Sequence, residues 1–178
     1  MSRRRILVLG GARSGKSAFA ERLAAESGAP VLYVATATAG DQEMAERIAQ
    51  HRAQRPASWR TLEVPVNVAA GVSAELHKQA EIVTVIVEDL TFLLSNLIGE
   101  DAGARANEAE ARAMAEVQGV LGLAANIILV SNEVGMGLVP PYPLGRLFRD
   151  ALGRLNQAAA AHSQEVYLLV AGLPLQLK

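Results

Sequence analysis

A glycine-rich loop close to the N-terminus limits what this chain can fold into more than any other feature of the sequence. The loop matches the phosphate-loop pattern G-x-x-x-x-G-K-S through Gly10, Gly11, Ala12, Arg13, Ser14, Gly15, Lys16 and Ser17. The apolar run Arg5–Leu9 before it predicts a buried strand, and Lys16–Glu26 after it predicts a helix. This order presents backbone N–H groups and a helix N-terminus to an anion. In such a loop Lys16 stabilises charge on the β- and γ-phosphates and the Ser17 hydroxyl binds Mg²⁺, so the sequence predicts a nucleoside triphosphate site.

The size and composition of the chain indicate that residues 1–178 form a single domain. Of the 178 residues 51% are hydrophobic, which suffices for an apolar core. A net charge of −1 gives no basic field that would attract nucleic acid or a membrane surface. The absence of cysteine excludes disulfides and favours a reducing cytoplasm. No apolar run reaches the length of a membrane span, and the short run after Arg3-Arg4-Arg5 ends in the phosphate loop, which argues against a signal peptide.

Segments rich in Val, Ile and Leu alternate with helical patterns along the whole chain. The predicted strands are Arg5–Leu9, Val31–Ala35, Ile82–Glu88, Ile127–Ser131 and Glu165–Ala171. The predicted helices are Lys16–Glu26, Gln42–Ala53, Val68–Lys78, Leu90–Ile98, Arg105–Ala124 and Gly145–Ala161. Near-continuous apolar strands are typical of a parallel sheet that is covered on both faces. We therefore predict an α/β fold, a three-layer P-loop NTPase fold with a mostly parallel, RecA-like sheet, to which residues 172–177 add an antiparallel C-terminal edge strand.

Polar residues follow two of the predicted strands, and in open α/β sheets the ligand binds at these carboxyl ends. The segment Thr36–Asp41 suits either a loop that passes close to a nucleotide or an ordinary turn with Asp41 as the N-cap of the next helix. The third strand ends in Glu88 and Asp89, where a carboxylate would bind Mg²⁺ beside Ser17. Glu88 is the preferred ligand and Asp89 the alternative.

The predicted helix Gln42–Ala53 places a histidine beside basic residues. Arg47 and His51 lie four residues apart and share one face, and Arg52 and Arg55 follow. Nearby cations disfavour imidazolium, leave a ring nitrogen free to attack phosphorus, and balance the charge on a departing pyrophosphate. His51 is therefore a candidate nucleophile, although a lone histidine is more often a structural or surface residue. The two other histidines lie on predicted surface helices and lack such neighbours.

A long loop follows the predicted strand Ile127–Ser131. Residues 132–143 contain two glycines and three prolines at the edge where a ligand would bind. Such loops often contact substrate, although a rigid connection to the next helix explains the composition equally well.

Taken together, these segments resemble the bifunctional adenosylcobinamide kinase/adenosylcobinamide-phosphate guanylyltransferase family of cobalamin biosynthesis. The resemblance covers nearly the whole chain. Besides the phosphate loop it is carried by Val31–Thr36, Asp41–Ala45, Arg47-Ile48, His51, Arg55-Pro56, Trp59–Thr61, Glu63, Asn132–Pro140, Arg149-Asp150, Gly153-Arg154 and Asn156-Gln157. The run N-E-V-G-M-G at residues 132–137 is far more distinctive than a phosphate loop.

The resemblance implies a P-loop enzyme with two activities on a corrinoid substrate. One phosphorylates the aminopropanol hydroxyl of adenosylcobinamide with ATP or GTP. The other transfers GMP from GTP to adenosylcobinamide phosphate, which gives adenosylcobinamide-GDP and pyrophosphate. The resemblance also implies a covalent GMP–histidine intermediate, which falls by position on His51, and a homotrimer. It places nucleotide contacts on the phosphate loop and on Ala35, Thr36, Ala37, Arg52, Ala53, Gln54, Arg55, Glu63 and Glu88.

The sequence departs from the family pattern at three places. Gln50 stands where a second histidine can precede the guanylylated one, which leaves His51 as the sole candidate. Asp89 stands beside Glu88 in place of an uncharged residue, so either carboxylate remains a candidate metal ligand. The segment Val66–Glu81 differs in length and composition, and no residue role carries over to it.

Two other functions remain as alternatives. A plain small-molecule kinase would use the phosphate loop and Glu88 but would leave His51 and its arginines without a role. A nucleotide-dependent switch or motor subunit would hydrolyse nucleotide without transfer to an acceptor. The sequence lacks the N-K-x-D guanine motif that a GTPase switch would carry.

Overall fold

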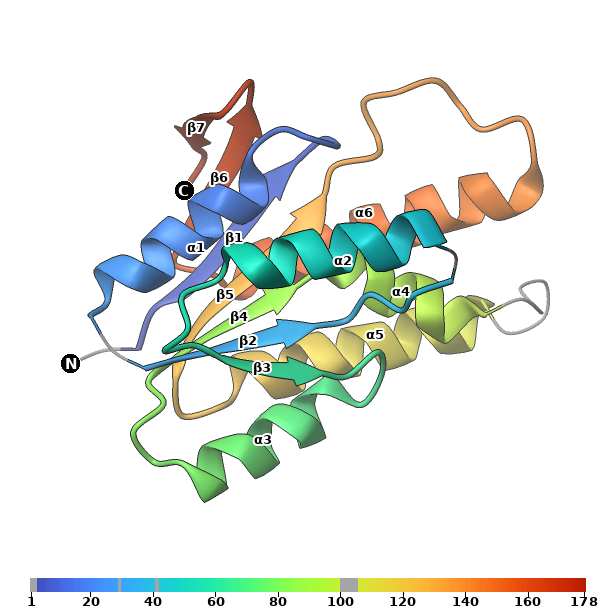
Figure 1. Ribbon diagram of the computed structural model, residues 1–178. Coiled ribbons are helices and arrows are strands. Elements are labelled where there is room, and N and C mark those ends of the chain that lie inside the picture. The colour runs from blue at the N-terminus through green and yellow to red at the C-terminus, as the bar shows by residue number, and fades with distance from the viewer. Residues whose placement is uncertain (1–2, 29, 41, 100–105) are drawn as a thin grey trace.

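A seven-stranded sheet forms the centre of the molecule (Figure 1). The computed structural model describes residues 3–28, 30–40, 42–99 and 106–178. In chain order the strands are β1 Arg5–Gly10, β2 Val31–Ala35, β3 Arg60–Glu63, β4 Thr84–Glu88, β5 Asn126–Asn132, β6 Glu165–Val170 and β7 Leu173–Gln176. They lie side by side in the order β3-β2-β4-β5-β1-β6-β7. Every neighbouring pair is parallel except β6 and β7, which are antiparallel.

Helices cover both faces of this sheet, so the molecule has three layers (Figure 1). The helices are α1 Lys16–Glu26, α2 Gln42–Gln54, α3 Val68–Lys78, α4 Leu90–Ile98, α5 Ala106–Leu121 and α6 Pro143–His162. On one face, the side chains of Phe19, Ala20 and Ala24 from α1 pack on alternate residues of β1, β2, β4 and β5. On the other face, α3, α4, α5 and α6 pack on the intervening residues of the same strands. The apolar strand sequences follow from this double coverage, because both faces of the central strands are buried.

The structure confirms the predicted fold, including the antiparallel C-terminal edge strand. The other predicted strands and helices are present with ends shifted by a few residues at most. Strand β3 was not expected from the sequence: it has four residues, lies at the edge of the sheet and alternates too briefly to show a pattern. Asp41, the expected N-cap of α2, lies outside the described residues. None of the helices in the described part of the chain has both the length and the apolar character needed to cross a bilayer.

Candidate functional site

The phosphate loop joins β1 to α1 and depends on glycine at two positions. Gly15, directly before α1, has a φ of +92°, a conformation that residues with a side chain rarely adopt. A Cβ at Gly15 would also lie 3.1 Å from the Cα of Gly172. At Gly10 a Cβ would overlap the Ser14 hydroxyl. The tight turn therefore leaves its backbone groups free to surround an anion at the start of α1.

Backbone hydrogen bonds hold the loop from both neighbouring strands. The Gly172 N–H, in the turn between β6 and β7, donates to the Ser14 carbonyl at 2.9 Å. On the other side, the Glu133 N–H, directly after β5, donates to the Gly10 carbonyl at 3.1 Å. Because these contacts use the main chain, the loop conformation depends on sheet order and not only on the loop's own residues.

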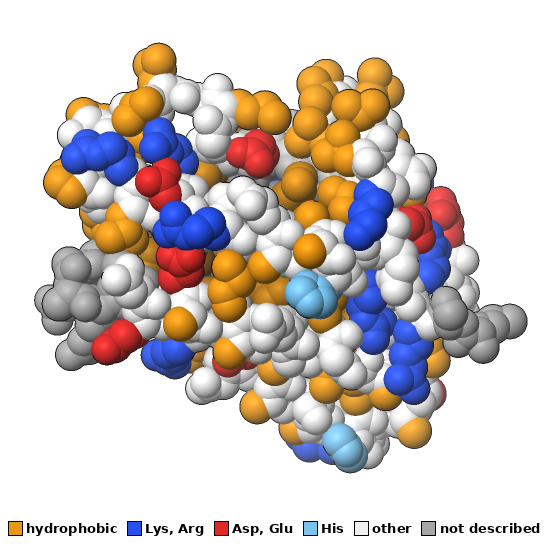
Figure 2. Space-filling model, turned by 180° about the vertical axis from the view of Figure 1, so that it is seen from behind, with side chains coloured by type: hydrophobic (Ala, Val, Ile, Leu, Met, Phe, Trp, Pro, Cys, Tyr) orange, Lys and Arg blue, Asp and Glu red, His pale blue; other side chains and the backbone are white. Residues whose placement is uncertain are grey.

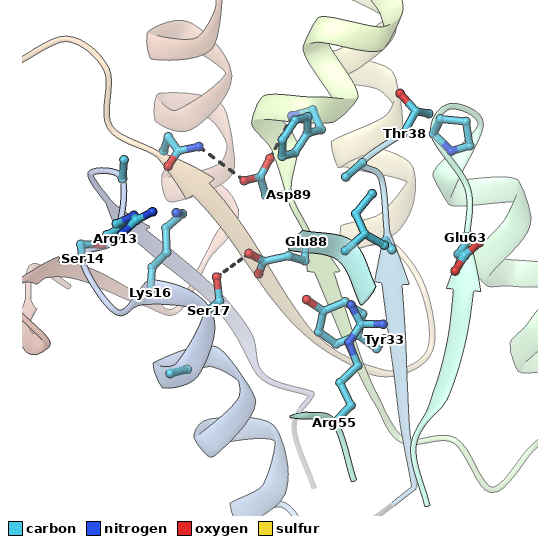
Figure 3. Close-up of a pocket in the computed structure, with 18 of the residues that line it drawn as sticks. Arg13, Ser14, Lys16, Ser17, Tyr33, Thr38, Arg55, Glu63, Glu88 and Asp89 are labelled. Atoms are coloured by element: carbon cyan, nitrogen blue, oxygen red, sulfur yellow. Dashed lines mark hydrogen bonds between the residues drawn. The ribbon is translucent and has the colours of Figure 1, made fainter. Parts of the chain in front are cut away.

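A carboxylate from β4 meets the loop serine (Figure 3). The Ser17 hydroxyl donates to Glu88 Oε1 at 2.5 Å, while Glu88 Oε2 is buried without a hydrogen-bond partner. Burial and the neighbouring Asp89 raise the pKa of Glu88 to about 7, against the opposing effects of the Ser17 hydrogen bond and the Lys16 charge. A hydroxyl beside a carboxylate with one unpartnered oxygen fits Mg²⁺, which binds few protein oxygens and takes its remaining ligands from phosphates and water.

Asp89, the alternative metal ligand, is engaged elsewhere. Its Oδ1 accepts the Phe92 N–H at 2.9 Å, which makes it the N-cap of α4. Its Oδ2 accepts a hydrogen bond from Asn132 Nδ2 at 3.4 Å. Both oxygens therefore have partners within the protein, in contrast to the second oxygen of Glu88.

A cavity of about 890 Å³ opens above the phosphate loop, a volume typical of small-molecule sites. It lies at the carboxyl ends of the parallel strands. The predicted nucleotide-site residues that line it are Ala12, Arg13, Ser14, Gly15, Lys16, Ser17, Ala35, Ala37, Arg55, Glu63 and Glu88. Those that do not line it are Gly10, Gly11, Thr36, Arg52 and Ala53.

Thr36 is fully buried and ties two strand ends together. Its hydroxyl accepts the Asp89 N–H at 2.8 Å and lies 2.7 Å from the Asp89 carbonyl. This hydroxyl therefore connects the end of β2 to the Glu88–Asp89 segment, and its polar group is used within the protein.

Arg55 lines the cavity, and its guanidinium lies over an aromatic ring (Figure 3). Its guanidinium carbon lies 3.5 Å from the centre of the Tyr33 ring, and its Nη1 donates to the Thr61 hydroxyl at 3.2 Å. Tyr33 is buried, and burial together with the Glu88 carboxylate raises the pKa of its hydroxyl. Arg52 instead pairs with Glu63 at 3.2 Å, where both side chains are exposed.

His51 lies near the C-terminal end of α2, four residues before Arg55. The side chains of His51 and Gln54 lie outside the described residues. The two other histidines, His77 and His162, are exposed on α3 and α6 as expected.

The structure adds cavity residues that the sequence alone did not single out. They are Ala18, Tyr33, Ile48, Val64, Pro65 and Phe92. The cavity is also lined by residues of segments that the sequence analysis marks as candidates: Thr38, Ala39, Asp89, Asn132, Glu133 and Val134. Asn132 ends β5, and Glu133 and Val134 begin the loop after it, for which the sequence allows either substrate contact or a rigid connection. Tyr33 lies within an apolar strand, where an aromatic residue is expected to belong to the hydrophobic core. Val64 and Pro65 follow the unpredicted strand β3, so no strand-end signal marked them.

Comparison with known proteins gives consistent similarities over nearly the full length. Residues 6–177 match the family model described as cobinamide kinase / cobinamide phosphate guanyltransferase. The bifunctional adenosylcobalamin biosynthesis protein CobP of Pseudomonas aeruginosa is 51% identical over 174 residues, which span 98% of this chain and 97% of that protein. The bifunctional adenosylcobalamin biosynthesis protein CobU of Escherichia coli is 41% identical over 183 residues, spanning 97% and 99%. Among solved structures, the RadB recombinase aligns with a TM-score of 0.48 at 16% identity, covering 92% of this chain and 72% of that one.

Proposed function

The chain belongs to the cobinamide kinase / cobinamide phosphate guanyltransferase family of bifunctional enzymes, and we propose that it performs both reactions at the cavity above the phosphate loop. One observation carries the proposal. A complete phosphate loop, a strand-end carboxylate and the residue directly after α2 converge on one cavity, through Lys16, Glu88 and Arg55. We also propose that residues 1–178 form one domain, because a single sheet takes strands from both ends of the chain.

In the kinase reaction, the enzyme transfers the γ-phosphoryl group of ATP or GTP to the aminopropanol hydroxyl of adenosylcobinamide. The loop N–H groups hold the triphosphate, and Lys16 stabilises negative charge on the phosphoryl oxygens as the bond to the leaving diphosphate breaks. Ser17 and Glu88 would hold Mg²⁺, which when bound neutralises charge on the β- and γ-phosphates. No covalent intermediate with the enzyme is needed, because positioning and charge stabilisation suffice for this transfer.

In the guanylyltransferase reaction, the neutral imidazole of His51 attacks the α-phosphorus of GTP. An N–P bond forms, the bond between the α-phosphorus and the bridging oxygen breaks, and pyrophosphate leaves. A phosphate oxygen of adenosylcobinamide phosphate then attacks the same phosphorus and displaces imidazole, which gives adenosylcobinamide-GDP. Arg55 lines the cavity from the chain segment that follows His51, where its positive charge favours departure of pyrophosphate.

The test follows the label of α-³²P-GTP on the protein. We expect acid-labile, base-stable label on the unaltered enzyme and none on His51→Ala, which should still transfer γ-phosphate to adenosylcobinamide. His77→Ala is the matched control, because His77 is exposed on α3 and lines no part of the cavity. Equal loss of both activities in folded His51→Ala would contradict the division of roles. If the wild-type enzyme took up no label but retained the kinase activity, this result would instead support the alternative function, a small-molecule kinase without guanylyl transfer.

The oligomeric state and the cellular location of the protein are predictions. A homotrimer is expected from the resemblance, and analytical ultracentrifugation of the purified chain would measure it. A cytoplasmic location is expected from the cysteine-free sequence.

A further inference from the structure

The loop between β5 and α6 (residues 133–142, the β5–α6 loop) leaves large hydrophobic side chains in solvent. Leu138 is 97% exposed and Met136 78%, and Val139 and Tyr142 are also exposed. In Figure 1 the loop extends beyond the carboxyl edge of the sheet before it turns back into α6. Exposed hydrophobic side chains that gather on one segment indicate a binding surface.

This hydrophobic surface is continuous with the cavity. Glu133 and Val134, the first two residues of the loop, line the cavity wall. Met136 follows two residues later and is already exposed. A molecule that reached into the cavity from this side would therefore contact the loop with its outer part.

Internal contacts give the loop a defined shape. Arg146 Nη1 donates to the carbonyls of Pro140 and Pro141 at 3.0 and 2.8 Å, and the Gly135 N–H donates to Glu133 Oε1 at 2.7 Å. A Cβ at Gly145 would lie 2.6 Å from the Tyr142 ring, so the ring packs directly on the start of α6. Such preformed contacts reduce the entropy that a surface loses when it binds a ligand.

The size of the cavity limits what it can hold. Its volume of about 890 Å³ suits one drug-sized ligand such as a nucleoside triphosphate. A corrin macrocycle with its amide side chains is larger than a nucleotide and would not fit beside one. Only the arm that carries the reacting hydroxyl or phosphate has to reach Lys16, so the macrocycle must lie outside the mouth of the cavity.

We propose that the β5–α6 loop binds the corrin macrocycle of the acceptor, with Met136 and Leu138 against its apolar face. The inference rests on the proposed function and adds the place where the second substrate binds. Another hydrophobic surface is less suitable: Leu173, Leu175 and Leu177 are exposed on and beside β7 but line no part of the cavity. In Figure 2 hydrophobic side chains gather at two separate places on the upper edge of the molecule, one at the left and one at the right. The β7 group lies on an open sheet edge, which suits a protein chain better than a macrocycle.

The double variant Met136→Ser/Leu138→Ser tests the proposal. Because both side chains are exposed, the thermal midpoint should not change. In equilibrium dialysis with cobinamide, followed by its visible absorbance, we expect the Kd to rise at least tenfold. The KM for GTP and the extent of labelling by α-³²P-GTP should stay within twofold of wild type. Leu177→Ser is the matched control and should leave the Kd for cobinamide unchanged.

The possible outcomes distinguish the proposed binding of the corrin macrocycle at the β5–α6 loop from the proposed enzymatic function. An unchanged Kd for cobinamide in the double variant would overturn the proposal. If sedimentation of that variant also showed a smaller assembly, the loop would be assigned to contacts between copies of the chain. Wild-type enzyme that binds GTP but neither binds nor modifies cobinamide would overturn the proposed function itself.

Discussion

The phosphate loop and the segment from α2 to β3 (residues 42–63, the α2–β3 side) line the same cavity, but different interactions hold them in place. The phosphate loop lies between the central strands, and backbone hydrogen bonds from Gly172 and Glu133 fix it from both sides. On the α2–β3 side, β3 is a four-residue edge strand. Backbone hydrogen bonds join β3 to β2 along one edge only. Side-chain contacts that include the stack of Arg55 on Tyr33 join the residues between α2 and β3 to the core.

This difference matches what the two sides do in the proposed reactions. Both reactions need the nucleoside triphosphate to be bound in the same position. A phosphate-loop conformation that backbone hydrogen bonds fix therefore serves both. Only guanylyl transfer needs a nucleophile from α2. We therefore expect changes beside the phosphate loop to affect the stability of the unliganded protein, and changes on the α2–β3 side to affect mainly one reaction.

The largest expected effect is on stability, from the buried carboxylate beside the loop. The pKa of Glu88 rises from 4.5 to about 7 in the folded protein, so the folded state binds the proton more tightly than the unfolded state. Stability of the unliganded protein should therefore fall as pH rises from 4.5 to 7, by about 3 kcal/mol in total. Glu88→Gln should remove most of this loss, since a neutral amide has no proton to release.

Urea unfolding at pH 5 and pH 8, without nucleotide or Mg²⁺, measures the effect. Asp89 contributes in the same direction, because burial raises its pKa as well, so a smaller slope should remain in Glu88→Gln. Equal pH dependence in wild type and Glu88→Gln would show that Glu88 is not the group responsible.

A smaller effect is expected from the aromatic ring under Arg55. Tyr33→Leu removes the cation–π contact, worth about 1–2 kcal/mol when desolvated, and should slow labelling by α-³²P-GTP about tenfold. Tyr33→Phe keeps the ring and should label at nearly the wild-type rate. The kinase rate should change less than the labelling rate in Tyr33→Leu, because the ring supports the α2–β3 side. Equal labelling rates for the two variants would show that the ring does not position Arg55.

The sequence predicted the phosphate-loop side well because the information there is local. The loop, the strand before it and the helix after it are adjacent in the chain, and each carries its own pattern. The parallel sheet was also predictable, since strands buried on both faces are apolar throughout. The pairing of Glu88 with Ser17 followed from the rule that strand ends meet at one edge.

The α2–β3 side was less predictable because its contacts join residues that no local pattern connects. Tyr33 reads as a core residue of β2, and only the fold places Arg55 on its ring. Thr36 stays a predicted nucleotide contact, and no local pattern indicates that tertiary structure uses its hydroxyl to hold Asp89. Strand β3 exists because β2 offers it a partner, not because four residues of alternating pattern predict a strand.

The smallest expected effect concerns the ion pair between Arg52 and Glu63. Their side chains are 66% and 59% exposed, and a pair at such a surface contributes at most about 1 kcal/mol. Arg52→Ala should therefore lower the thermal midpoint by no more than about 4 °C. If Arg52 contacts the nucleotide, as the family resemblance implies, the KM for GTP should nevertheless rise several-fold. Lys78→Ala, which removes the ion pair of the exposed Lys78 with Glu75 on α3, should leave that KM unchanged. A midpoint lowered by about 5 °C or more would instead make the pair a structural link between α2 and β3, and an unchanged KM would remove Arg52 from the nucleotide site.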